Sequence, residues 1–258
     1  MTQFRPVPGI ASWFNTWSVR SEDDRVATHC DIRPSLCRPD GSVSPAVVLF
    51  TADVACGIAA GLAVQSKGLW TVTTDLHVEM TGPITGSVLR VESEIVRAGA
   101  TTVVARFVVR DADRGEVVGG GTGNFRPLQA EFDPSWLQFP VGVRLGQPEP
   151  PADADVDMIE RLGIAMVDGG VQMDLTDWHF NPWGIMHGGA TGAIVQAAAA
   201  VSGWTAVGLA VRYLAGGKVG PIRAEVVAGD QALSHIEVTD VGADGRRIAI
   251  ATVRSLNP

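Results

Sequence analysis

The sequence has few cysteines, and their arrangement neither binds metal nor builds a disulfide framework. Cys30, Cys37 and Cys56 are the only three, and none of them forms a CxxC pair. A sparse, odd number of cysteines excludes a fold held together by several disulfides, and it excludes a zinc site built from paired CxxC motifs. We expect reduced, mostly buried thiols, which are typical of the cytoplasm, and so predict a cytoplasmic location.

Basic charge and long apolar runs are lacking as well. Lys and Arg total 20 against 28 Asp and Glu, a net charge of −8, whereas nucleic-acid-binding domains are usually basic. Met1–Ala11 has no basic flank followed by an apolar stretch, so no signal peptide is expected. The most apolar run, Ile185–Val201, contains His187 and Gln196 and is too short to span a bilayer comfortably. We predict a buried helix there, and neither a nucleic-acid nor a membrane partner.

Recognisable metal and cofactor motifs are missing. No pair among the five histidines has metal-ligand spacing. Gly119–Gly123 (GGGTG) is not followed by the Lys-Ser/Thr of a phosphate-binding loop. The sequence therefore predicts no metal and no cofactor.

A proline-rich stretch divides the chain in two. Six prolines stand between residues 127 and 151, among acidic residues and few periodic apolar positions. Prolines at this density prevent regular helix and central strand. We predict an N-terminal domain over residues 1–128, a linker over 129–155 and a C-terminal domain over 156–258.

Both halves repeat one plan, a buried helix followed by an antiparallel meander. The first half is expected to have a helix at Ser44–Gly61 and strands at Trp70–Met80, Gly86–Val96, Thr101–Arg110 and Glu116–Arg126. The second half is expected to have a helix at His187–Val201 and strands at Trp204–Leu214, Ile222–Ala228, Ala232–Asp240 and Arg246–Ser255. Each helix is apolar nearly all round, so a sheet must wrap it, and the predicted fold class is α+β.

The sharpest local signal is Asn181–Gly189 (NPWGIMHGG), which opens the second helix. Gly188 and Gly189 let another group approach the backbone closely. The first turn of a helix offers free N–H groups and the positive end of the dipole. Such a place suits a polarised carbonyl or a developing oxyanion.

The pattern Asn-x5-His-Gly-Gly, opening a buried alanine-rich helix, resembles the phenylacetyl-CoA thioesterase-like branch of the hotdog superfamily. The resemblance implies two tandem hotdog domains that form an intramolecular pseudo-dimer. It also implies hydrolysis of an acyl-CoA to the free acid and CoA. In that branch a carboxylate stands nine positions after the His, but here that position holds Gln196.

The first half supplies the missing carboxylate. Superposing the predicted helices places Ser44 on His187, and Asp53 follows Ser44 by nine positions. Arg38 stands six positions before Ser44, where the motif has Asn. Dimeric members of the family build each site across the interface, so the resemblance implies one composite site in the fused chain. Its members would be Asp53, Asn181, His187 and Gly188. The equivalent site at the start of the first helix, here called the mirror position, would consist of Ser44, Arg38 and Gln196 and would be inactive.

The resemblance also assigns roles. The thioester carbonyl would accept a hydrogen bond from the Gly188 N–H, and Asp53 would attack that carbonyl or activate a water. His187 would set the loop, and Asn181 would position the water or the carboxylate. The predicted substrate-binding residues are Gly189, Trp183 and Thr74.

A hydroxyl on the strand after the helix holds the water or nucleophile in the family. By position Thr73 or Thr74 would do so, and Thr73 is taken as the catalytic one. Two other functions remain open, a non-catalytic acyl-CoA or lipid-binding protein and a hotdog enoyl-CoA hydratase or dehydratase. The expected partner is the acyl-CoA substrate, and a homodimer of fused chains is a further prediction.

Overall fold

The computed structural model describes residues 9–23, 25–129, 139–146, 151–181, 183–230 and 232–255. Its helices are α1 (Ile10–Trp13), α2 (Pro45–Gln65), α3 (Met158–Arg161) and α4 (Gly188–Val201). Its strands are β1 (Thr16–Arg20), β2 (Val26–Asp31), β3 (Leu69–Met80), β4 (Val88–Ala98), β5 (Val103–Asp111), β6 (Glu116–Gln129), β7 (Arg144–Gly146), β8 (Ile164–Val167), β9 (Gly170–Met173), β10 (Ala206–Tyr213), β11 (Ile222–Gly229), β12 (Leu233–Asp240) and β13 (Arg246–Ser255).

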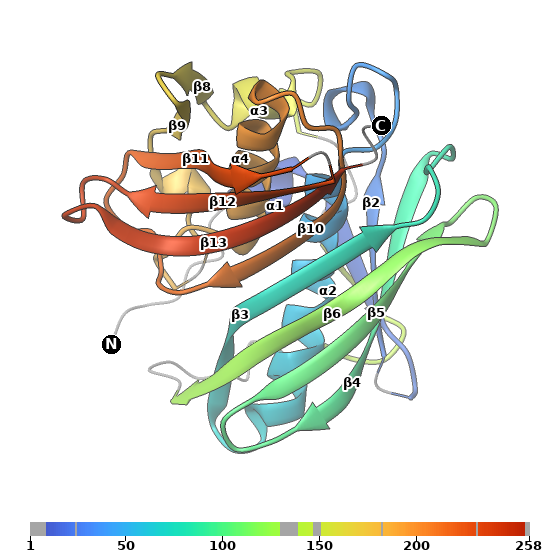
Figure 1. Cartoon of the computed structure of the whole chain (residues 1–258). Coiled ribbons are helices and arrows are strands. Elements are labelled where there is room, and N and C mark those ends of the chain that lie inside the picture. Colours follow the sequence, from blue (N-terminus) through green and yellow to red (C-terminus); the bar gives the residue numbers. More distant parts are fainter. Residues whose placement is uncertain are drawn as a thin grey trace.

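These strands form one antiparallel sheet that joins the two halves. Its order is β7-β1-β2-β4-β5-β6-β3-β10-β13-β12-β11-β9-β8. The seam is the pairing of β3 with β10, which runs from Gly208 opposite Glu79 to Arg212 opposite Asp75. Figure 1 shows the sheet curving around α2 and α4, with the N-terminal half in blue and green and the C-terminal half in orange and red. The predicted α+β plan, one helix and a meander in each half, is confirmed.

The meander strands were predicted, but the flanking strands β1, β2, β8 and β9 were not. The buried positions of β1 and β2 include Ser18 and Thr28, whose hydroxyl groups bond each other at 2.7 Å. Polar residues at buried positions remove the apolar alternation that identifies a strand in sequence. The other two are only four residues each, which is too short for a clear period.

The predicted linker is described only in part. Residues 130–138 and 147–150 lie outside the described residues. Within the intervening part, Arg144–Gly146 forms β7, which pairs with β1 and lies at the edge of the sheet. This triplet contains no proline, so its backbone N–H groups can donate to a neighbouring strand.

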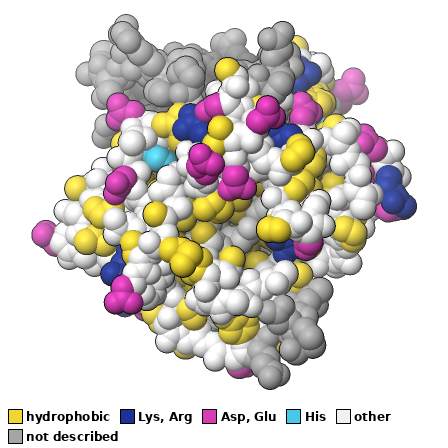
Figure 2. All heavy atoms as spheres, turned by 90° about the horizontal axis from the view of Figure 1, so that it is seen from above, with side chains coloured by type: hydrophobic (Ala, Val, Ile, Leu, Met, Phe, Trp, Pro, Cys, Tyr) yellow, Lys and Arg dark blue, Asp and Glu magenta, His cyan; other side chains and the backbone are white. Residues whose placement is uncertain are grey.

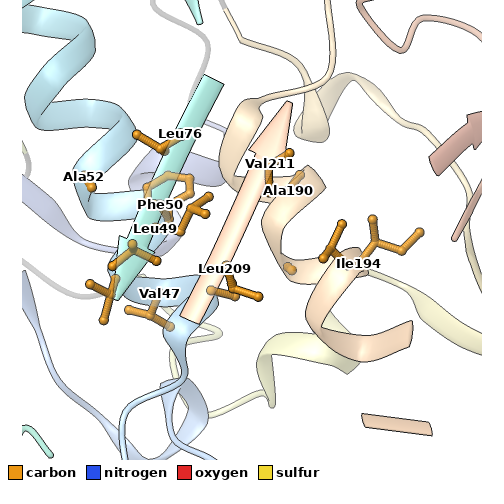
Figure 3. Packing of buried hydrophobic residues seen from close by; sticks show 14 of the residues in the cluster. Val47, Leu49, Phe50, Ala52, Leu76, Ala190, Ile194, Leu209 and Val211 are labelled. Carbon is orange, nitrogen blue, oxygen red and sulfur yellow. The ribbon is translucent and has the colours of Figure 1, made fainter. Parts of the chain in front are cut away.

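Helix α2 is long and apolar enough to cross a membrane by length and composition, but most of it is buried within the protein. It packs against β2, β3, β4, β5 and α4. Figure 3 shows Phe50 and Leu49 of α2 together with Leu76 of β3 and Leu209 of β10, next to α4. Burial of most of its surface accounts for the largely apolar composition of this helix.

Glycines in α4 let the two helices approach closely. A Cβ placed on Gly189 would lie 2.0 Å from Cδ2 of Phe50, and one on Gly192 would lie 2.7 Å from Cδ2 of Leu49. Real side chains do not pack so tightly, so only glycine fits at Gly189 without a rearrangement of Phe50. This close contact brings the start of α4 to the N-terminal part of α2.

Candidate active site

Asp53 is a buried carboxylate at the contact between the two halves. It lies in α2 and is only 8% exposed. Thr73 of β3 donates a hydrogen bond to its Oδ1 at 2.8 Å, and its Oδ2 lies 3.5 Å from Nδ1 of His187. His187 immediately precedes α4. The carboxylate of one half therefore meets the helix start of the other.

A β-bulge places Thr73 beside this carboxylate. The pairing of β3 with β6 skips one residue between Thr73 and Asp75. A bulge adds an unpaired residue and re-aims the neighbouring side chains. The skipped residue is Thr74, whose hydroxyl donates to the carbonyl of Asn124 at 3.0 Å. Of the two predicted threonines, Thr73 is thus the one that contacts Asp53.

His187 caps α4 with its side chain. Its Nδ1 accepts a hydrogen bond from the backbone N–H of Gly189 at 3.0 Å. Because a backbone N–H can only donate, a neutral His187 carries its proton on Nε2. Burial lowers the pKa of His187 below the usual 6.5, although the charge of Asp53 acts in the opposite direction. The ring also stacks on Phe50, with centroids 4.7 Å apart. Burial therefore favours the neutral imidazole, and the hydrogen bond from Gly189 and the stacking on Phe50 hold the ring in one orientation.

Gly188 lies directly against the carboxylate. A Cβ on Gly188 would be 2.6 Å from Oδ2 of Asp53. Within the described part of the chain, the N–H of Gly188 has no hydrogen-bond partner. An unpaired N–H at a helix start is a donor aimed at whatever lies before the helix, and the helix dipole adds positive potential.

Burial sets the ionisation of Asp53. It raises the pKa above the usual 3.8, while the charge of a protonated His187 and the hydrogen bond from Thr73 act in the opposite direction. A raised pKa brings the carboxyl closer to the range in which a general base works efficiently. Strongly perturbed carboxyls with defined partners occur often at functional sites.

Tyr213 is a member of this site that the sequence analysis missed. It ends β10, and its hydroxyl donates to the carbonyl of Gly188 at 3.0 Å. Burial and the nearby charge of Asp53 raise its pKa well above 10. Tyr213 is the only tyrosine in the chain. That rarity was the one available signal, since no spacing rule links a strand end to a helix start in another element.

Two predicted residues lie in the loop before α4. The side-chain oxygen of Asn181 accepts hydrogen bonds from the backbone of Trp183 at 2.9 Å and of Ile185 at 3.4 Å. Asn181 thus stabilises the turn that precedes His187. Among the described residues, no hydrogen bond joins Asn181 to Asp53. The Trp183 ring lies 4.8 Å from that of Trp70 in β3, measured between centroids.

The mirror position, at the start of α2, is closed by Gln196. Its side-chain oxygen accepts hydrogen bonds from the Ser44 hydroxyl and from the backbone N–H of Ala46, both at 2.9 Å. Pro45 stands where the other helix has Gly188 and carries no N–H. Arg38 donates to the carbonyl of Ala206 at 2.8 Å. The mirror position therefore lacks both the carboxylate and the free donor.

The strand beside Gln196 has lost its hydroxyl too. Strand β10 carries a bulge between Ala206 and Gly208, just as β3 carries one between Thr73 and Asp75. The two bulges make Ala206 the counterpart of Thr73. Alanine has no hydroxyl to bond the neighbouring helix, so the two positions differ in the helix residue, the helix start and the strand.

Two large cavities lie away from Asp53. Each has about 630 Å³; one lies over the β3–β10 seam and includes His77, Arg212 and His235, and the other includes Arg33 and Arg38. Figure 2 shows one face of the molecule, where hydrophobic side chains lie near the middle and acidic and basic ones are interspersed around them. Among the described residues, no cluster of three or more His, Cys, Asp or Glu could hold a metal ion.

No family model matches the sequence, and a sequence search of curated proteins finds no match. Solved structures share the fold. An acyl-ACP thioesterase from Bacteroides thetaiotaomicron has a TM-score of 0.63 at 12% identity, over 90% of this chain and 98% of that one. The 12:0-ACP thioesterase from Umbellularia californica has 0.63 at 16%, over 91% and 98%. A putative oleoyl thioesterase from Lactobacillus plantarum has 0.60 at 16%, over 92% and 98%. These full-length matches confirm the predicted tandem double hotdog fold.

Proposed function

We propose that this chain hydrolyses acyl thioesters, with acyl-CoA as the substrate, at one composite site between its halves. One observation carries the proposal: the buried carboxylate of Asp53 lies against Gly188 at the start of α4, and the N–H of Gly188 has no hydrogen-bond partner among the described residues. A base or nucleophile beside an oxyanion donor is the minimal apparatus for acyl transfer.

The reaction follows from these positions. The carbonyl oxygen of the thioester accepts a hydrogen bond from the Gly188 N–H, helped by the helix dipole, while His187 holds the start of α4. Asp53 takes a proton from water as the water oxygen attacks the carbonyl carbon, and the Gly188 N–H and the helix dipole stabilise the tetrahedral oxyanion. The oxyanion then collapses and the C–S bond breaks. The leaving sulfur takes the proton from Asp53, which gives the acid, the free thiol and the ionised Asp53.

Direct attack by Asp53 reaches the same products. An Asp53 oxygen bonds the carbonyl carbon, the thiolate leaves, and water hydrolyses the resulting anhydride to the acid and the free carboxylate. Both routes need an ionised Asp53. In either route the Thr73 hydroxyl holds Oδ1, which leaves Oδ2 toward Gly188.

The carrier that the enzyme prefers can be tested by offering the same acyl groups on CoA and on ACP. The similar structures are named for acyl-ACP substrates, whereas the Asn-x5-His-Gly-Gly motif favours CoA. Matched acyl-CoA and acyl-ACP panels of varied chain length and aromaticity should show the higher kcat/KM with CoA. Preference for ACP would keep thioester hydrolysis and overturn the CoA assignment.

The same panel separates the rival functions. A protein that only binds acyl-CoA would show saturable binding of these thioesters without release of free thiol. A hydratase would consume enoyl-CoA without breaking the C–S bond. Measuring thiol release and enoyl absorbance in parallel distinguishes the three.

Activity is expected to fall as the pH drops through the raised pKa of Asp53. The protonated carboxyl can neither accept a proton nor attack, so kcat/KM should show an acid limb with its midpoint above 3.8. The raised pKa of Asp53 also makes the stability of the fold depend on pH. Because the folded pKa is raised, the Asp53 contribution to stability is greatest below 3.8 and declines as the pH rises through the folded pKa. An acid limb that persists unchanged in Thr73→Val would contradict the assignment, since loss of that hydrogen bond should raise the midpoint further.

Changing Gln196 to alanine is expected to reduce stability but not activity. The change leaves the Ser44 hydroxyl and the Ala46 N–H without their partner, at a cost of about 1–3 kcal/mol. Thermal unfolding and kcat should be measured on the same preparation. A large fall in kcat with little change in Tm would mean that the mirror position takes part in catalysis.

A further inference from the structure

Tyr213 places its hydroxyl inside the site from the carboxy-terminal half. The hydroxyl donates to the carbonyl of Gly188 at 3.0 Å. A Cβ on Gly188 would lie 3.2 Å from this hydroxyl oxygen and 2.6 Å from Oδ2 of Asp53. The phenol and the carboxylate therefore flank the same glycine from two different elements.

The peptide group between Gly188 and Gly189 is held at both ends. Its carbonyl accepts the hydrogen bond from Tyr213, and its N–H donates to Nδ1 of His187 at 3.0 Å. A peptide group is planar, so bonds on opposite sides fix its plane. Glycine otherwise permits a wide range of backbone angles. The Gly188 N–H lies on the other side of the same Cα, so holding this plane restrains the directions that this N–H can take.

At the mirror position, Met80 stands where the site has Tyr213. Tyr213 stands seven residues after Ala206, and Met80 stands seven residues after Thr73, at equivalent distances from the two bulges. Methionine has no hydrogen to donate. The hydroxyl is thus present beside the carboxylate and the free N–H, and absent where Gln196 closes the helix start.

We propose that Tyr213 is a positioning residue that holds the Gly188–Gly189 peptide so that the Gly188 N–H and Asp53 address the same carbonyl. The proposal rests on the proposed thioester hydrolysis. Tyr213 does not exchange a proton with the substrate; it acts through the backbone, and its contribution belongs to the transition state because the oxyanion needs the N–H in a fixed direction.

The kinetic test uses Tyr213→Phe in the full chain. The ring stays, and only the donor to Gly188 is removed. We expect kcat to fall about 10- to 100-fold, as for a small misplacement of a catalytic group, while KM changes by less than about twofold. Met80→Leu, the matched change at the mirror position, should leave kcat unaltered. A folded Tyr213→Phe protein with unchanged kcat overturns the proposal, as does a fall confined to 1/KM.

A spectroscopic test does not depend on the variant's folding. Because the chain has a single tyrosine, incorporation of 3-fluorotyrosine gives one 19F resonance from this site. We expect that resonance to shift with the ionisation of Asp53, to lose this pH response in Asp53→Asn, and to shift on binding a non-hydrolysable acyl-CoA analogue. A resonance indifferent to all three overturns the proposal. A chain inactive on every thioester would refute the proposed function, while the pH response would still decide whether Tyr213 and Asp53 act as one unit.

Discussion

Asp53→Asn is expected to lower kcat/KM for acyl-CoA roughly 1,000-fold, the loss typical when a catalytic base is removed. Asparagine keeps the size of the side chain, and its oxygen can still accept the hydrogen bond from Thr73. It cannot take a proton from water or attack a carbonyl. The measurement is steady-state hydrolysis across the acyl-CoA panel, with the residual rate compared at several pH values.

Folding of Asp53→Asn should be intact or improved. Burial raises the pKa of Asp53, so the ionised carboxylate costs stability at neutral pH, and a neutral amide removes that cost. The matched control is Gln196→Glu, the reverse exchange at the mirror position, which should keep full activity. Combining both changes should not restore activity, because Pro45 offers no N–H and Ala206 no hydroxyl. Rescue by the double change would contradict the assigned asymmetry.

Gly188→Ala is expected to lower kcat about 100-fold, the scale of a misplaced catalytic group. The added Cβ would lie 2.6 Å from Oδ2 of Asp53, inside the contact distance. Either the carboxylate or the start of α4 must move, and both are needed for the reaction. The measurement is kcat beside Tm, since the loss should exceed anything that reduced stability explains.

Gly192→Ala, one helical turn further along, is the control for this change. Its Cβ would meet Cδ2 of Leu49 at 2.7 Å, which is the flexible end of a side chain rather than the carboxylate. We expect a lower Tm and nearly unchanged kcat. Equal losses of kcat in the two variants would indicate that general packing of α4, and not the contact with Asp53, supports activity.

Much of the fold could be predicted because its signals are local and repeated. The helix at Pro45–Gln65 and the meander after it follow from apolar runs, alternation and turns, and the second half repeats them. The flanking strands could not be found this way. Ser18 and Thr28 satisfy each other's hydroxyl groups inside the fold, and such a pair is visible only after β1 and β2 meet.

Some residues of the site could likewise be predicted from the sequence, and others depend on contacts that form only in the fold. Asp53 and His187 were paired by superposing two helices, and the structure brings them to 3.5 Å. Thr73 and Thr74 could not be separated in sequence, because a bulge decides which hydroxyl faces α2. Tyr213 reaches Gly188 from the end of β10, and spacing does not encode this tertiary contact between a strand end and a helix start. Asn181 was predicted to position the water or the carboxylate, and that role stays a prediction; its side-chain oxygen accepts hydrogen bonds within the loop before α4.

The most direct measurement is a crystal structure of the chain with a non-hydrolysable acyl-CoA ketone analogue. The account predicts one analogue per chain, with its carbonyl oxygen on the Gly188 N–H and its carbonyl carbon beside Asp53. An analogue bound at the start of α2 beside Gln196, or one whose carbonyl contacts neither Gly188 nor Asp53, would contradict it.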